Sequence, residues 1–264
     1  MEYLMTYGWA ILILAIILGA LAQLGVFSNL SFAPRATPGS CQIMRSQFYP
    51  TSLQGACQGA LPQYVAKFKG QGDYVSATLP TSSPITLSFW YNRGAFTSTY
   101  FHVMNKGSTR FFQIYSPSSA PYLAFKYVDS IGNPYEFYLT SSNQPASTWI
   151  YVSATLDAGG TFNGYINGVN SRTYTSVGIL GLDTNSLQMS SGDYNGTMAN
   201  VQVYNTSLSA NEINSLYLKG IGGAPIDLQH IVGWWPLNGD TKDYSGNNNN
   251  GAPSGGTFTN SYGK

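Results

Sequence analysis

Residues 3–27 form an apolar run that limits what the N-terminal part of this chain can become. The run carries no formal charge, and between Trp9 and Phe27 only Gln23 is strongly polar. As a helix, about 25 residues extend roughly 37 Å, enough to cross a hydrocarbon layer of about 30 Å. The run is apolar on every face, which disfavours both an amphipathic surface helix and a helix in a β core. We therefore predict one long hydrophobic α-helix within residues 1–30.

The basic residues near this run bear on the orientation of the chain in a membrane. Arg35 and Arg45 follow the run, whereas no basic residue precedes it. By the positive-inside rule this pattern places the rest of the chain in the cytoplasm. A basic leader ahead of Met1, removed after insertion, would reverse that assignment, and we expect one.

The cysteines and sequons favour an extracellular location. Cys41 and Cys57 are the only two cysteines, and a disulfide between them would close a loop of roughly 15 residues and contribute about 3 kcal/mol in the chain-entropy model. Such a bond implies an oxidising compartment, with two buried free thiols as the alternative. Asn-X-Ser/Thr sequons occur at Asn29, Asn195 and Asn205. We expect glycans on Asn195 and Asn205 rather than on Asn29.

The chemistry of the chain changes after the apolar run. The stretch "SFAPRATPGSC" carries two prolines and a Pro-Gly pair, which are typical of a linker, and we assign residues 31–63 to a linker that contains the disulfide loop. Charged residues make up only 9% of the chain and the net charge is +1. A nucleic-acid partner therefore has no electrostatic support.

Residues 64–264 are rich in short β-type runs separated by turn residues. Examples are "ITLSFWYNR", "PYLAFKYV", "TWIYVSATLDAGG" and "FNGYINGVN". Strands this frequent, without helical patterns between them, predict an all-β antiparallel sandwich or barrel. One helix is expected in "SLSANEINSLYLKG", where Ser209 and Glu212 form a capping box and Gly220 ends the helix.

The opening sequence "MEYLMTYGWAILIL" resembles the N-terminal segment of archaeal type IV pilins of the class III signal peptide type. Glu2 and the following Tyr-Leu match the family, and the resemblance covers about the first 27 residues. It implies a helix in the core of an extracellular filament of identical subunits, reached from a membrane-inserted precursor. It also implies that Glu2 meets the amine or polar backbone of a neighbouring subunit. The alternative is that Glu2 only complements the positive helix N-terminus.

Small residues recur on one face of this predicted helix. Ala15, Gly19 and Ala22 follow helical spacing, which allows two helices to approach closely. Together with Glu2, they are the predicted assembly residues.

The second half resembles laminin-G-like jelly rolls of the concanavalin A type. The stretches "FKGQGDYVSA", "ITLSFWYNRG", "WIYVSATLDAGGTFNGYINGVN" and "GTMANVQVYNTSLSANEINSLYLKG" occur in the family order over residues 64–220. The element "WWPLNGDTKDYSGNNNNG" normally precedes them, and here it comes last. We predict a circularly permuted jelly roll whose C-terminal stretch fills the missing strand positions in its own subunit. Donation to a neighbouring subunit is the alternative.

Catalytic patterns are not found in the sequence. The chain has three glutamates, Glu2, Glu136 and Glu212, and no Glu-x-Asp-x-x-Glu arrangement. Paired carboxylates are what a glycosidase of this fold would need. His102 and His230 have no nucleophile signature beside them. We therefore predict no enzyme activity.

The resemblance to laminin-G-like jelly rolls also suggests calcium as a candidate ligand. Oxygen ligands would come from Asp73 and from Asp243, Asn247 and Asn249 in the C-terminal stretch. Related jelly rolls usually carry an acidic pair before "VQVYN", where this chain has Asn200. The alternative is a turn whose Asp and Asn side chains bond their own backbone.

These observations combine into one functional prediction. We expect an extracellular type IV pilus-like subunit, with its helix in the filament core and its sandwich displayed outside for adhesion. Surface glycans are the candidate partners of the sandwich. The alternative is a membrane-anchored, monomeric surface lectin.

Overall fold

A computed structural model describes part of the chain. The described residues are 13–17, 41–43, 51–53, 61–70, 72–79, 83–94, 101–106, 111–116, 122–140, 144–181, 186–190 and 194–260, and only the backbone is described for 41–43, 51–53 and 101–106. The chain divides into two compact units, Met1–Arg35 and Ala36–Lys264.

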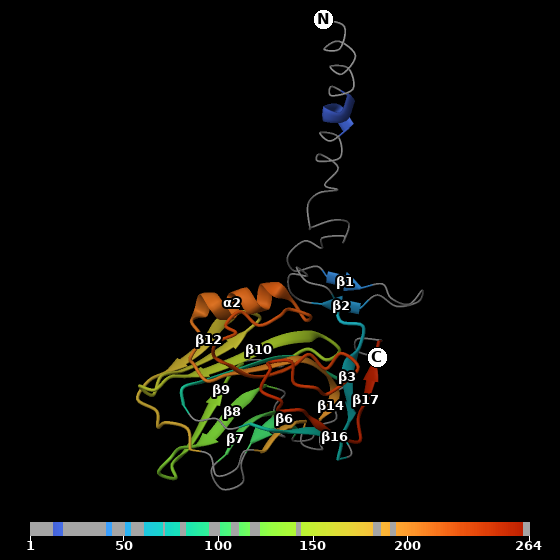
Figure 1. The fold of residues 1–264 in the computed structure, drawn as a ribbon. Coiled ribbons are helices and arrows are strands. Elements are labelled where there is room, and N and C mark those ends of the chain that lie inside the picture. The colour runs from blue at the N-terminus through green and yellow to red at the C-terminus, as the bar shows by residue number, and fades with distance from the viewer. Residues whose placement is uncertain are drawn as a thin grey trace, which may run out of the picture. The chain divides into compact units, whose positions relative to one another are not determined.

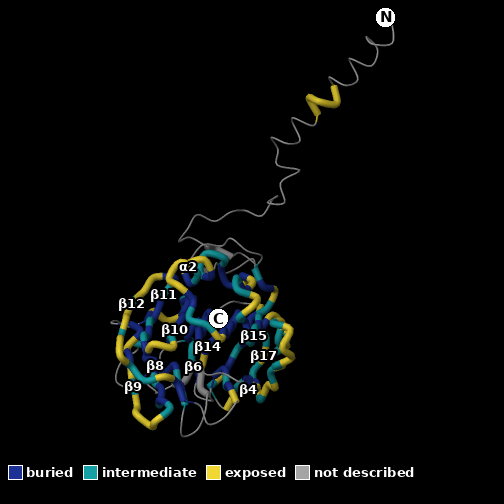
Figure 2. The backbone as a smooth tube through the Cα atoms, turned by 60° about the vertical axis from the view of Figure 1, so that its left-hand side comes forward, coloured by how far each residue is buried: buried dark blue, intermediate teal, exposed yellow. Residues whose placement is uncertain are grey.

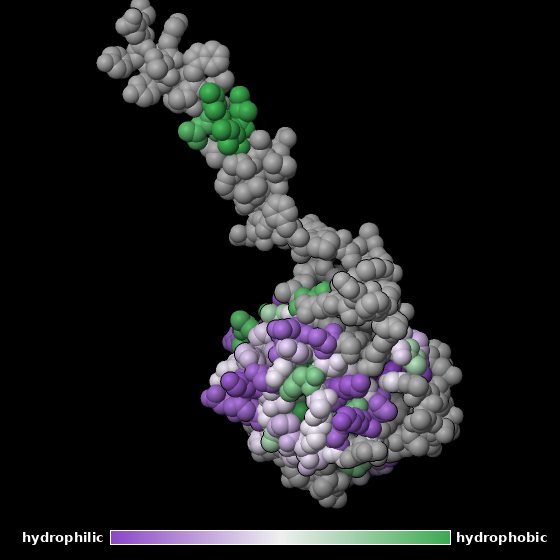
Figure 3. All heavy atoms as spheres, turned by 90° about the vertical axis from the view of Figure 1, so that its right-hand side faces the viewer, coloured by the Kyte–Doolittle hydropathy of each residue, from purple (hydrophilic) through white to green (hydrophobic). Residues whose placement is uncertain are grey.

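The first unit contains a described helical stretch at residues 13–17. Its isoleucine and leucine side chains are all more than half exposed (green in Figure 3). The structure therefore shows only this short stretch of the long hydrophobic helix predicted for residues 1–30. The other residues of that range lie outside the described ones. Among the described residues, no helix has the length and apolar character needed to cross a membrane.

The second unit is a sandwich of two β-sheets (Figure 1). The main path of the ten-stranded sheet runs, in order of neighbours, through β1 (Cys41–Ile43), β2 (Thr51–Leu53), β10 (Trp149–Leu156), β5 (Ile85–Arg93), β14 (Asn195–Tyr204), β3 (Val65–Lys69) and β17 (Thr257–Thr259). Beside β10 the sheet continues through β11 (Phe162–Ile166) and β12 (Val169–Tyr174), and β15 (Ile231–Trp235) pairs with β14.

The second sheet has seven strands. Their order is β16 (Ala252–Ser254), β4 (Tyr74–Thr78), β13 (Ser186–Met189), β6 (Phe101–Lys106), β7 (Phe112–Ser116), β8 (Ala124–Val128) and β9 (Pro134–Tyr138). Strand pairings in both sheets are antiparallel apart from one parallel contact between β2 and β10. The predicted all-β antiparallel sandwich is confirmed. Strands β1 and β2 lie within the stretch predicted as a linker.

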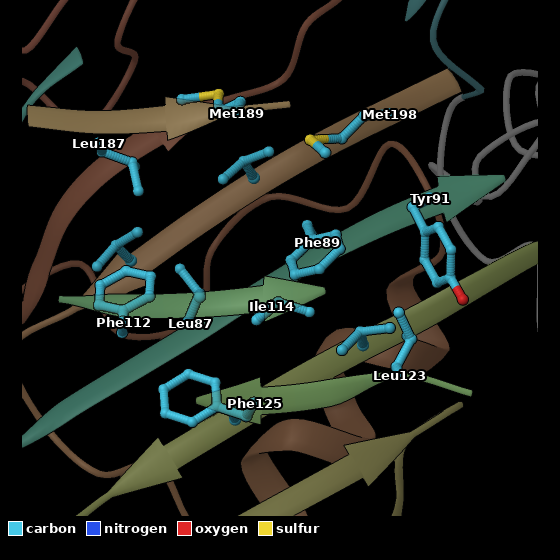
Figure 4. Packing of buried hydrophobic residues seen from close by; sticks show 14 of the residues in the cluster. Leu87, Phe89, Tyr91, Phe112, Ile114, Leu123, Phe125, Leu187, Met189 and Met198 are labelled. Carbon is cyan, nitrogen blue, oxygen red and sulfur yellow. The ribbon is translucent and has the colours of Figure 1, made fainter. Parts of the chain in front are cut away.

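The main core lies between the two sheets. Leu87 and Phe89 of β5 alternate with outward-facing residues and pack with Ile114 and Phe125 of the smaller sheet (Figure 4). Strand β5 is buried along its whole length because its outer face is covered too. Continuous burial of both faces explains why its sequence is apolar at most positions.

Helix α2 (Ala210–Lys219) covers the outer face of the larger sheet. Its residues Ile213 and Leu216 are buried, and Tyr217 stacks on Trp90 of β5 at 5.8 Å between ring centroids. The capping box predicted at Ser209 is present: the Ser209 backbone N–H donates to the Glu212 carboxylate at 2.7 Å. The predicted end at Gly220 is also confirmed.

The C-terminal segment contributes to both sheets. Strand β15 pairs with the second half of β14, β17 pairs with β3, and β16 pairs with β4. Trp235 and Leu237 are fully buried in the main core. The C-terminal segment therefore occupies strand positions in both sheets of its own chain. In Figure 2, β10 and β14 are largely dark blue, whereas β12 at the rim is largely yellow.

The face of the sandwich seen in Figure 3 is mostly hydrophilic or neutral over the described residues. Apolar side chains occur there only as small separate groups among the described residues. Such scattered apolar residues are ordinary for a soluble surface.

Candidate functional site

A β-bulge in β14 builds the first part of the candidate site. The register against β5 shifts between Ala199 and Gln202, and Asn200 has a φ of 51°. Met198 faces the main core before the bulge, and Val201 faces it afterwards. A regular strand would place residues three apart on opposite faces, so the bulge shifts the alternation by one residue.

The side chain of Asn200 uses its polar atoms in the fold. Its Oδ1 accepts hydrogen bonds from the Trp234 indole Nε1 and the Gln202 Nε2, both at 2.9 Å. Its Nδ2 donates to the carbonyl of Gly223 at 2.8 Å. Asn200 is buried, so these bonds satisfy a polar group that would otherwise be costly to bury.

A turn after β15 fixes the backbone of Trp234. The carboxylate of Asp243 accepts N–H bonds from Trp234 at 2.9 Å, Ser245 at 2.8 Å and Asn249 at 2.9 Å. The side-chain amides of Asn247 and Asn249 donate to carbonyls of β15 at 3.0 and 2.8 Å. These side chains therefore organise the turn on which Trp234 is held.

A surface pocket of about 330 Å³ opens beside this turn. Its polar and aromatic residues come from the β14 bulge, from β15 and from the segment after β15. The lining is completed by Leu61, Pro62, Ile221, Gly222 and Pro236. We call it the Trp234 pocket, defined by Asn200, Trp234, Asn238, Asp240 and Tyr244.

Within the Trp234 pocket, Tyr244 contacts both the ring of Trp234 and the carboxylate of Asp240. The Tyr244 ring meets Trp234 edge-on at 6.1 Å between centroids. The Tyr244 hydroxyl donates to Asp240 Oδ2 at 3.0 Å. This hydrogen bond, with the negative charge of Asp240, raises the pKa of Tyr244 above its ordinary value of 10.0.

The pocket therefore combines aromatic surface with oxygen and amide groups. A ligand with one apolar face and hydroxyls on its edge would match this combination.

The predicted calcium ligands take structural roles. Asp73 accepts the backbone N–H of Lys69 at 2.9 Å, and Asp243, Asn247 and Asn249 organise the turn described above. This is the arrangement stated as the alternative to calcium. In the described part of the chain, no group of three or more His, Cys, Asp or Glu residues is placed to hold a metal.

The predicted sequons are described in part. Asn195 begins β14 and Asn205 follows its end, and both residues are exposed. Exposure is what glycan attachment requires. Asn29 lies outside the described residues.

The predicted assembly and disulfide residues are mostly not described. Ala15 lies in the helical stretch at 13–17, whereas Glu2, Gly19 and Ala22 lie outside the described residues. Cys41 belongs to β1 by its backbone alone, and Cys57 lies outside the described residues.

The histidine and glutamate residues of the sandwich lie in different elements of the fold. His230 Nδ1 lies 2.7 Å from Asp227 Oδ2 within one turn. Glu212 caps α2, and Glu136 is exposed on β9. His102 belongs to β6 by its backbone alone.

Comparison with known proteins gives the family. A model of laminin-G-like domains, described as the concanavalin A-like lectin/glucanases superfamily, matches residues 69–214. The chain belongs to this superfamily. The predicted resemblance to laminin-G-like jelly rolls is thereby confirmed, and the match ends before the segment that carries most of the Trp234 pocket. No curated protein sequence matched the chain.

Solved structures share the fold at low sequence identity. A candidate carbohydrate-binding protein from Bacteroides ovatus has a TM-score of 0.60 and 17% identity, over 80% of this chain and 66% of that protein. The heptameric SAP-like pentraxin from Limulus polyphemus has a TM-score of 0.50 and 12% identity, over 63% of this chain and 87% of the pentraxin. The binding domain of botulinum neurotoxin serotype G has a TM-score of 0.45 and 12% identity, over 54% of this chain and 37% of that domain.

Sequence analysis missed the pocket itself. Trp234, Asp240 and Tyr244 are in the quoted stretch "WWPLNGDTKDYSGNNNNG", whose mixture of aromatic, acidic and amide residues was the available signal. In the sequence, Asn200 stands out only because it replaces an acidic residue of the related jelly rolls. Its bond to Trp234 links positions 34 residues apart, which no local pattern indicates.

Proposed function

We propose that this chain is an extracellular, surface-displayed carbohydrate-binding module that uses the Trp234 pocket. The observation that carries the proposal is the arrangement of Trp234, Tyr244 and Asp240 around one pocket. Membership of a superfamily that includes lectins supports it. The class of ligand is inferred from the chemistry of the pocket, because the fold alone does not determine function.

The chemistry of a sugar ring fits this pocket. The C–H groups on one face of a pyranose pack against an aromatic side chain, while its hydroxyls bond carboxylate and amide groups. Asp240 has one oxygen that accepts the Tyr244 hydroxyl, and a carboxylate has further acceptor positions for a ligand hydroxyl. The side-chain amide of Asn238, whose Oδ1 accepts the Tyr64 N–H at 2.8 Å, still has its NH₂ donors.

Binding to immobilised neutral and acidic glycans tests this proposal on the full chain in detergent. Asp240→Asn should weaken binding of the selected glycan about tenfold or more, because a charge-assisted hydrogen bond is lost. The matched control is Asp157→Asn, which alters another turn aspartate, one that accepts the Gly159 and Thr161 N–H groups. Equal binding by the Asp240 and Trp234→Ala variants and the unaltered chain would refute the proposal.

We propose further that the N-terminal segment assembles the chain into a pilus-like filament of identical subunits. The described helical residues support this, since Ile13, Leu14, Ile16 and Ile17 expose apolar side chains that must be covered by lipid or by other helices. The resemblance of the opening sequence to archaeal type IV pilins favours other helices. In this proposal residues 1–30 form the filament helix, 31–63 the linker and 64–264 the displayed sandwich.

Negative-stain imaging of surface material distinguishes the filament from a membrane-anchored monomeric lectin. Glu2→Gln should reduce filament yield more than membrane insertion, because the charge is costly in lipid and is expected to be compensated at a subunit contact. Unchanged filament yield would remove this role of Glu2. The absence of filaments with the chain retained in membranes would favour the monomeric lectin.

Intact-mass and peptide mapping of the same material tests the covalent part of the proposal. We expect a disulfide between Cys41 and Cys57 and glycans on Asn195 and Asn205. Two free thiols or bare asparagines at both positions would refute the corresponding assignment.

A further inference from the structure

A second pocket, of about 390 Å³, lies between an edge of each sheet. Its lining is Tyr122, Tyr138, Thr140, Arg172 and Tyr174, and we call it the Arg172 pocket. Strand β9 ends the smaller sheet and β12 ends the β10–β11–β12 arm of the larger one. Across this junction Phe137 of β9 stacks on Tyr174 of β12 at 4.3 Å between centroids. The two walls of the pocket are therefore held together by core packing.

The cationic wall comes from Arg172, which is exposed on β12. Its Nη1 donates to the carbonyl of Ser171 at 2.9 Å. In the described part of the chain the one ion pair joins His230 and Asp227, so no described carboxylate pairs with Arg172. A guanidinium has five N–H donors in a planar fork, and most of them remain for a ligand.

The opposite wall is aromatic and hydroxylated. Tyr122 and Tyr138 meet edge-on at 4.8 Å between centroids, and Tyr138 is 43% exposed. The Thr140 Oγ1 accepts the Leu123 N–H at 3.0 Å, which leaves the hydroxyl proton to donate. The wall thus offers ring surface and hydroxyl groups beside the charge of Arg172.

From this geometry we infer that the Arg172 pocket binds a carboxylate-bearing sugar residue of an acidic polysaccharide. The planar guanidinium fork matches a carboxylate through two parallel hydrogen bonds. The tyrosine wall contacts the sugar ring, which a simple anion or an acidic side chain lacks. The two pockets share no residue, so this inference depends on the proposed function only in that both ligands are saccharides.

Nearby charges modulate the site in a predictable way. Glu136 is exposed on β9, beside Tyr138, and is paired in strand register with Lys126 of β8. Its negative charge opposes an acidic ligand. Glu136→Gln should therefore strengthen binding, whereas Arg172→Gln should weaken it.

Calorimetric titration of the full chain in detergent tests the inference. The probes are a short oligogalacturonate and the same oligomer with its carboxyl groups reduced to hydroxymethyl groups. We expect the acidic oligomer to bind at least about tenfold more tightly than the reduced one. Arg172→Gln should remove that difference, and Arg172→Lys should keep part of it because the charge remains without the fork.

Two control variants distinguish binding at the Arg172 pocket from binding through another cation or at the Trp234 pocket. Lys242→Gln removes another exposed cation and should leave binding of the acidic oligomer unchanged. Trp234→Ala should also leave it unchanged, while it removes binding at the Trp234 pocket. The inference is overturned if the unaltered chain does not bind the acidic oligomer or if Arg172→Gln binds it normally. Equal binding of the reduced oligomer, or of polyglutamate, also overturns it, as does loss of binding in Trp234→Ala.

Discussion

The indole Nε1 of Trp234 donates a hydrogen bond to the side-chain oxygen of Asn200 at 2.9 Å. This bond joins the bulge of β14 to the C-terminal strand β15, which pairs with β14 just beyond it. It places the Trp234 ring at the pocket in the free protein. A ligand that packs on this ring therefore meets a preformed surface and pays little ordering entropy.

Asn200→Ala should destabilise the fold by about 2–3 kcal/mol, because a buried hydrogen-bonded amide is removed and alanine must adopt a φ of 51°. Urea denaturation would measure the loss. Asn248→Ala is the control, since Asn248 has a similar φ of 58° but is exposed. Equal losses in the two variants would mean that the side-chain bonds of Asn200 add nothing to backbone strain.

Ser209→Ala should cost about 1 kcal/mol, because the N-cap side chain that receives the Glu212 N–H is removed. Ser215→Ala is the matched control in the same helix. The Ser215 hydroxyl bonds the Asn211 carbonyl at an exposed position, so its removal should change stability little. Thermal unfolding of both variants checks the difference, and a larger loss for Ser215→Ala would contradict it.

Truncation after Gly220 should cause aggregation. It removes β15, β16 and β17, which leaves the edges of β14, β3 and β4 unpaired. It also removes Trp235 and Leu237 from the core. A chain ending after Asn260 keeps all three strands and is the control. Sedimentation and circular dichroism compare them, and a monomeric truncated chain with an unchanged melting temperature would refute the role of this segment.

Asp129 should make stability depend on pH in acid. Burial acts to raise the pKa of Asp129, but hydrogen bonds from the Asn133 backbone and side chain and from the Ile131 and Gly132 backbones outweigh it and lower that pKa below its ordinary value of 3.8. The folded pKa lies below the unfolded one, so the charge stabilises the fold above the unfolded pKa. That stabilisation is lost as pH falls through the folded pKa.

Asp129→Asn should therefore lower the urea midpoint at pH 7 and differ less from the unaltered chain at a pH below the folded pKa of Asp129, which itself lies below 3.8. A loss that is equal at both pH values would show that the charge of Asp129 is not responsible.

Local patterns in the sequence were enough to predict several elements. The run Ile85–Arg93 became β5 with the same bounds, because its mostly apolar and β-branched residues suit a strand buried on both faces. Ser209, Glu212 and Gly220 define helix α2 through bonds among neighbouring residues. The sandwich class followed from the same kind of signal, whereas the family followed from the resemblance of longer stretches to laminin-G-like jelly rolls.

The Trp234 and Arg172 pockets were decided by the tertiary structure. The Trp234 pocket depends on a bulge at Asn200 that changes which side chains of β14 face outward, and on a strand that returns from the C-terminal end to meet it. The Arg172 pocket depends on β9 and β12, which belong to different sheets and come together through the packing of Phe137 on Tyr174.

The sequence by itself determined the strands, the capped helix, the apolar N-terminal run and the sandwich class, because alternation, capping and hydrophobicity act between residues close in the chain. Only the tertiary structure decided strand register, the bulge and the two pockets. Register and bulges are set by the fit of side chains from distant segments in one core, and that fit has no local signature.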